Sequence, residues 1–238
     1  MSAADAPPAD VRPASSSPVE TPPGRRPADA VVGNRVVRFD RAERCLHWVN
    51  ATLVLTLIIT GSFMYVGALS GIFGRALIET VHLYAGLALP VPFALAFAGR
   101  WNRGLRRDAK RISRFLADDW RWLRGRTRRT GTLRVGKFNA GQKLNAILVV
   151  GTLPVMFGTG ILLQWNDWMS DSWRTGATFV HDWLALALVA VVVGHIGKAL
   201  AEPLALRAMR TGTVPADHVR RHHPRWWREI EPSEAPPD

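Results

Sequence analysis

Four long stretches without charged side chains most constrain how this sequence can fold. They cover residues 45–74, 80–99, 144–166 and 175–197, and the last is interrupted only by Asp182. A helix needs about 20 apolar residues to cross the hydrocarbon core of a bilayer. We therefore predict an all-α fold, a transmembrane four-helix bundle. Its spans are expected at about 46–67, 80–99, 142–165 and 176–200. Prolines in the second and third spans predict kinks there.

The basic residues are distributed very unevenly between the two sides of these spans. The chain carries 31 Lys+Arg and a net charge of +12, and 29 of the 31 lie before the first span, between the second and third, or after the fourth. The positive-inside rule therefore places both termini and the loop 100–141 in the cytoplasm, as in a multi-pass protein of the bacterial inner membrane. Trp165, Trp168 and Trp173 would form an aromatic belt on the outer side, with Trp48 on the inner side. The excess charge is thus explained by orientation and contact with lipid, and we expect no nucleic-acid binding.

The segments outside the spans divide into tails and an amphipathic part. Residues 1–34, rich in Ala, Pro and Ser, and residues 232–238 are expected to be disordered. The start of the chain lacks the apolar core of a signal peptide. The remaining 35–231 would form one four-span domain with a cytoplasmic tail at 201–231. In the loop, apolar residues recur at helical spacing and predict a helix lying on the inner leaflet or docking a soluble partner: Ile112, Phe115, Leu116 and Leu123.

Four histidines lie in or at the spans: His47, His82, His181 and His195. Ionisable residues at membrane depth are functional candidates, although any one of them could be a hydrogen-bonded structural residue. His181 and His195 are 14 residues apart, which puts them on one face of a helix and about 21 Å apart along its axis. Depth then pairs His47 with His195 on the inner side and His82 with His181 on the outer side. Two such pairs suit two stacked haems better than zinc, which needs four ligands. In contrast, His218, His222 and His223 lie in the polar tail and are expected to be solvated.

Two further features each allow two interpretations. Gly61, Gly86 and Gly194 lie near the histidines and could admit a porphyrin or pack helices together. Asn139 and Gln142 precede the third span, where they could cap the helix or offer amide groups to a quinone carbonyl.

Several motifs together resemble one family. They are Arg38-Phe39-Asp40-Arg41, Cys45-Leu46-His47-Trp48, Val81-His82-Leu83-Tyr84-Ala85-Gly86, Lys137-Phe138-Asn139-Ala140-Gly141-Gln142-Lys143, Val180-His181-Asp182, Gly194-His195-Ile196 and the tail box from Arg221-His222-His223-Pro224 to Trp227. With these, the sequence resembles the cytochrome b (gamma) subunit of respiratory membrane-bound formate dehydrogenase over about 35–231. The tail box and the Asn-Ala-Gly-Gln segment are the most specific parts.

The resemblance implies a di-haem subunit that passes electrons to membrane quinone and so contributes to proton-motive force. It implies two b-type haems, with His82 and His181 as axial ligands of the outer iron and His47 and His195 of the inner iron. Asn139, Gly141 and Gln142 match the family's quinone-binding segment, whether menaquinone or ubiquinone is used. Partners implied are an iron–sulfur (beta) subunit and a catalytic molybdenum or tungsten (alpha) subunit, with a trimer of heterotrimers as a family expectation. A single cysteine cannot hold an iron–sulfur cluster, so that chemistry would belong to a partner.

Two alternatives remain open from the sequence. The chain could serve another respiratory complex, such as a nickel–iron hydrogenase, with nearly the same internal chemistry. It could also be a haem-free membrane anchor or transporter, for which paired histidines at two depths have no purpose.

Overall fold

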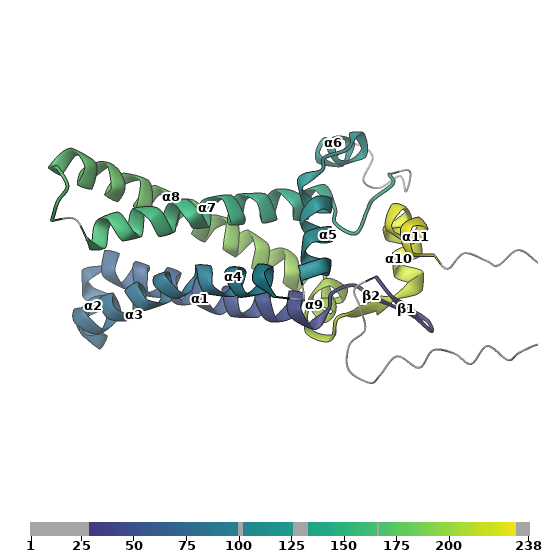
Figure 1. Ribbon diagram of the computed structural model, residues 1–238, viewed down its shortest axis with the longest axis horizontal. Coiled ribbons are helices and arrows are strands. Elements are labelled where there is room, and N and C mark those ends of the chain that lie inside the picture. Colours follow the sequence, from purple (N-terminus) through teal and green to yellow (C-terminus); the bar gives the residue numbers. More distant parts are fainter. Residues whose placement is uncertain (1–28, 100–101, 126–132, 166, 232–238) are drawn as a thin grey trace, which may run out of the picture.

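The computed structural model describes residues 29–99, 102–125, 133–165 and 167–231. Most of the two tails predicted to be disordered therefore lies outside the described residues. The described chain is dominated by long helices that run side by side along the longest axis (Figure 1).

Four helical spans form the bundle and confirm the predicted fold class. They are α1 (Arg41–Tyr65), α3 (Arg75–Ala88) continued by α4 (Pro90–Ala98), α7 (Ala140–Gln164) and α8 (Asp171–Ala201). The second span is interrupted at Leu89 because Pro90 begins a new helix, whereas α7 continues through Pro154. All four are long and apolar enough to cross a bilayer, and the chain is a multi-pass membrane protein.

The interior of the bundle has one buried apolar layer near its middle. Val54, Leu89, Leu153 and Leu188 form it, one from each span. The outward faces remain apolar and uncovered, with Leu95 67% exposed, for example. Such surfaces require lipid, because a soluble protein rarely leaves so much apolar area open to water.

A small module, which includes β1 and α11, closes one end of the bundle (Figure 1). Its elements are β1 (Val31–Val32), β2 (Arg35–Val37), β3 (Thr213–Pro215), α9 (Pro203–Thr211), α10 (Ala216–His222) and α11 (Pro224–Ile230). The strands form an antiparallel sheet in the order β1-β2-β3, with Val36 opposite Val214. Trp226 and Trp227 pack against this sheet and are buried. This sheet was not predicted from the sequence, and residues 29–34 were expected to belong to a disordered tail.

The loop between the second and third spans contains two helices where one was expected. They are α5 (Asn102–Ser113) and α6 (Ala117–Leu123), and at the opposite end of the bundle α2 (Gly67–Phe73) joins the first two spans (Figure 1). The break comes before α6 because the Asp119 carboxylate accepts a hydrogen bond from the Leu116 amide at 2.9 Å and starts a new helix. Asp119 also pairs with Lys143 of α7 at 2.7 Å, which fastens α6 to the bundle.

Candidate functional site

The structure brings the four membrane histidines together in two pairs. His82 of α3 faces His181 of α8, with ring centres 6.4 Å apart and planes inclined at 64°. His47 of α1 faces His195 of α8, with ring centres 6.2 Å apart and planes inclined at 59°. These are the partners expected from depth along the helices.

The spacing within each pair can be compared with that of two axial ligands of one iron. A metal–imidazole bond is about 2 Å long and the ring centre lies roughly 1 Å behind its nitrogen, so two imidazoles on opposite sides of one ion have centres roughly 6 Å apart. Both observed separations agree with this value. The residues present therefore fit haem iron held from two sides.

The apolar layer of the bundle separates the two pairs. Leu188 lies seven residues from His181 and seven from His195, and Val54 lies seven residues from His47. Seven residues are about two helical turns, or roughly 10 Å. The pairs therefore occupy two levels, one above and one below the middle of the bundle.

Threonine hydroxyls contact His82 and His181, the pair predicted to lie on the outer side and called the outer pair below, from the neighbouring helices. Thr60 Oγ1 lies 2.8 Å from His82 Nδ1, and Thr159 Oγ1 lies 2.8 Å from His181 Nδ1. Both threonines are buried. Neither threonine was predicted from the sequence, although each is followed by glycine and each precedes its histidine by 22 residues.

The glycines near the histidines differ in what they accommodate. A Cβ at Gly61 would lie 3.4 Å from His82 Cε1, so this glycine makes room for the imidazole. Gly160 has the corresponding position beside His181, at 3.6 Å. A Cβ at Gly86 would contact Leu57 at 3.8 Å, which is helix packing.

The segment before α7 forms the cap that its sequence allowed. The Asn139 side chain accepts from the Gln142 amide at 2.9 Å, and the Gln142 side chain accepts from the Asn139 amide at 3.1 Å. The cap uses only the side-chain oxygens. Within the described residues, neither side-chain NH₂ group donates a hydrogen bond, so both remain available to an acceptor. Gly141 lies under the Trp122 ring, with 3.0 Å from a Cβ position to the nearest ring carbon.

His223 fastens the small module at the end of the bundle to this segment. The sequence predicted a solvated side chain for His223, but the side chain is buried. Its Nδ1 donates to the Gly136 carbonyl at 2.6 Å, and its Nε2 lies 3.5 Å from Arg38. Burial, together with the Arg38 charge, lowers the pKa of His223 to about 3. Burial also lowers the pKa of Arg38 to about 10, although Asp108 and Glu202 oppose the shift.

A buried group of charges supports the same segment. The Lys137 side chain is fully buried and pairs with Asp108 at 2.6 Å and with Asp29 at 3.7 Å. Arg111 joins both carboxylates, at 3.0 Å to Asp29 and 3.1 Å to Asp108. Because each charge has a close partner, the group is compatible with burial and holds α5, the residue that precedes β1 by two positions and the segment before α7 together.

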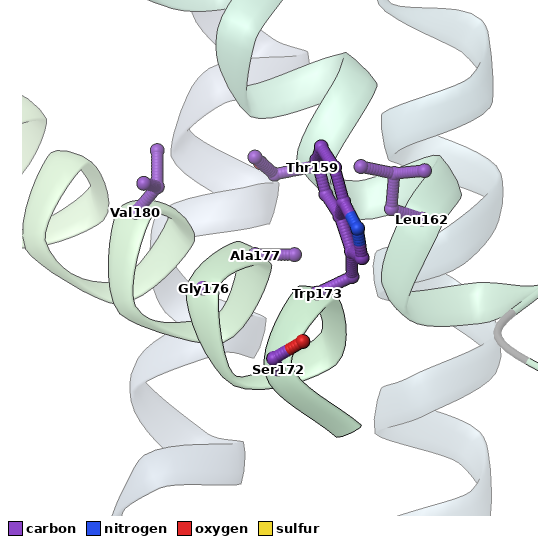
Figure 2. A pocket seen from close by; sticks show the side chains of 7 residues that line it. All are labelled: Thr159, Leu162, Ser172, Trp173, Gly176, Ala177 and Val180. Carbon is purple, nitrogen blue, oxygen red and sulfur yellow. The ribbon is translucent and has the colours of Figure 1, made fainter. Parts of the chain in front are cut away.

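A cavity between α7 and α8 opens beside Thr159. Figure 2 shows its lining: Thr159, Leu162, Ser172, Trp173, Gly176, Ala177 and Val180. Neither histidine of the outer pair lines it, so it is distinct from the space between the imidazoles. The side chains that line it are apolar apart from the hydroxyl groups of Thr159 and Ser172 and the indole N–H of Trp173.

Known proteins match most of the chain. The prokaryotic cytochrome b561 family matches residues 38–212. The formate dehydrogenase cytochrome b556(fdo) subunit of Escherichia coli K12 is 26% identical over 208 residues, which cover 82% of this chain and 93% of that protein. The nitrate-inducible formate dehydrogenase cytochrome b556(Fdn) subunit of the same strain is 24% identical, over 84% of this chain and 94% of its own. The formate dehydrogenase cytochrome b556 subunit of Haemophilus influenzae is 23% identical, over 82% and 83%. These matches confirm the resemblance predicted from the motifs.

Proposed function

This chain belongs to the prokaryotic cytochrome b561 family, whose name implies b-type haem, and from this premise we propose that it is the quinone-reducing cytochrome b subunit of a formate dehydrogenase. The observation that carries the proposal is the presence of two facing histidine pairs at two levels of one bundle. A b-type haem bound there would carry one electron at a time through its iron.

The chain's own contribution is to supply ligands at two depths. His82 and His181 would hold the outer iron, and His47 and His195 would hold the inner iron. Both pairs use α8, so this one rigid helix sets the distance between the two sites. The apolar layer between them keeps water out of the path.

The quinone site lies at the inner end, next to the start of α7. The NH₂ groups of Asn139 and Gln142 donate hydrogen bonds to a quinone carbonyl, while their oxygens hold the helix cap. Gly141 leaves room for the ring of Trp122, which forms one wall. Protons for quinol formation come from the cytoplasmic side. Movement of electrons toward the cytoplasmic side, together with uptake of protons from that side, separates charge across the membrane. Each elementary charge moved across the membrane stores about 2.3 kcal/mol per 100 mV of membrane potential.

The orientation and partners follow from the same reasoning. Both termini and the loop with α5 and α6 face the cytoplasm of a bacterium, and the chain lies in the inner membrane. Electrons reach the outer pair from an iron–sulfur subunit, which receives them from a molybdenum- or tungsten-containing subunit that oxidises formate. The three subunits assemble as a trimer of heterotrimers.

Purification of the chain from its native membrane with its partners tests this function. We expect formate to reduce the b-type haems anaerobically and added quinone to reoxidise them. Hydrogen in place of formate as the effective reductant would contradict the proposal and assign the chain to a hydrogenase. A preparation without haem would contradict the cytochrome function altogether.

A further inference from the structure

The two hydroxyl contacts of the outer histidine pair share one geometry. Thr60 on α1 contacts His82, and Thr159 on α7 contacts His181, each at 2.8 Å between Oγ1 and Nδ1. The two contacts come from different hairpins of the bundle and therefore form independently. Each histidine of the outer pair thus has a threonine hydroxyl at its Nδ1 atom.

The direction of these hydrogen bonds follows from the other partner of each hydroxyl. Thr60 Oγ1 lies 2.7 Å from the Thr56 carbonyl, and Thr159 Oγ1 lies 2.8 Å from the Val155 carbonyl. A carbonyl can only accept, and a threonine has a single O–H donor. The hydroxyl proton is therefore used by the backbone, and the hydroxyl oxygen must accept from the imidazole. This places the proton on Nδ1 and leaves the Nε2 lone pair free to bind a metal.

The inner pair lacks this arrangement. In the part of the chain that the structure describes, His195 Nδ1 has only a long side-chain contact of 3.5 Å, with the Asn145 amide. For His47, no side-chain hydrogen bond is present among the described residues. The two levels of the bundle therefore differ in how their histidines are held.

We propose that Thr60 and Thr159 are positioning residues that lower the reduction potential of the outer haem below that of the inner haem. The proposal rests on the haem function proposed above. A hydrogen-bond acceptor at the distal ring nitrogen makes a metal-bound imidazole more basic, and a more basic ligand stabilises ferric over ferrous iron. A lower potential outside and a higher one inside favour electron transfer from the entry side toward the quinone side.

Spectroscopic redox titration of the purified complex tests this proposal. Thr60→Val and Thr159→Val each remove an acceptor while keeping the shape of the side chain. We expect each to shift the ferric–ferrous equilibrium of the outer haem toward the ferrous form by about five- to tenfold. A tenfold shift is about 59 mV for one electron. The inner haem should keep its potential, and Thr60→Ser and Thr159→Ser should restore wild-type values.

Thr80 and Thr178 provide matched controls on the helices that carry the histidines. Among the described residues, their hydroxyls bond only to backbone carbonyls, of Ala76 at 2.8 Å and of Arg174 at 3.0 Å. Thr80→Val and Thr178→Val should therefore leave both potentials unchanged. Equal shifts in the control variants, or no shift of the outer haem in the test variants, would overturn the proposal.

Two results separate this inference from the proposed function. A wild-type complex without two titrating haems would refute the function itself, before any variant is made. If a valine variant fails to retain the outer haem, Thr60→Cys and Thr159→Cys provide the measurement, because sulfur is a weaker acceptor. They should shift the outer potential in the same direction by a smaller amount, and an unshifted potential in them would overturn the inference.

Discussion

Acidification should loosen the docking of α11 on the rest of the chain, because His223 is buried there in its neutral form. Its pKa is lowered to about 3 by burial and by the charge of Arg38, whereas an exposed histidine titrates near 6.5. Between these two values, the undocked tail binds a proton that the docked tail does not. Docking is therefore unaffected above pH 6.5 and weakens as the pH falls below it, by about 1.4 kcal/mol at pH 5.5 and about 2.7 kcal/mol at pH 4.5. His218, whose pKa is lowered by partial burial and by His222, adds a contribution of the same sign.

Hydrogen exchange of the α11 amides measures this loosening in the intact chain. With labelling times corrected for intrinsic exchange rates, opening should be about tenfold more frequent at pH 5.5 than at pH 7.5. In His223→Asn the side-chain amide can still donate to the Gly136 carbonyl but has no proton to gain, so most of the pH dependence should disappear. The same pH dependence in both proteins would refute the reasoning.

Three substitutions test other parts of the account. Asp108→Ala should lower stability by about 3 kcal/mol, because it removes the closest partner of the fully buried Lys137 side chain, and an unchanged thermal midpoint would contradict this. Asn139→Ala should slow quinol formation with both haems in place and weaken the helix cap by about 1 kcal/mol, and unchanged quinone kinetics would leave Asn139 with only a capping role. Gly61→Val should remove the optical signal of the outer haem alone, because the added side chain would displace His82, and retention of both haems would show that the bundle absorbs it.

The sequence predicted the parts of this molecule that depend on local properties and depth. Four apolar runs specify spans because a bilayer demands a fixed helix length. The unequal distribution of basic residues predicts which ends of those spans face the cytoplasm, and this orientation stays a prediction. Helical periodicity then aligned His181 with His195, and two pairs followed without any knowledge of tertiary contacts.

The parts that the sequence did not predict depend on contacts between distant segments. Strand β2 pairs with β3, and Arg35 contacts Thr213 across 178 positions. Nothing local marks such pairing. The first hairpin did have a local signal, because only Gly33 and Asn34 separate the two valine-containing strands, and Gly33 takes a positive φ of 56°. Because the tail is basic and rich in histidine, His223 was expected to be solvated. Its burial depends on contacts with the Gly136 carbonyl and the Arg38 side chain, which are distant in the sequence.

The central claim is that two histidine pairs hold two haems at two levels, and haem content per chain measures it most directly. The purified wild-type chain should contain two b-type haems. His82→Ala and His181→Ala should each remove the same haem and leave the other spectrum intact, while His47→Ala and His195→Ala should each remove the second. Loss of different haems within one pair, or full haem content in all four variants, would contradict the account.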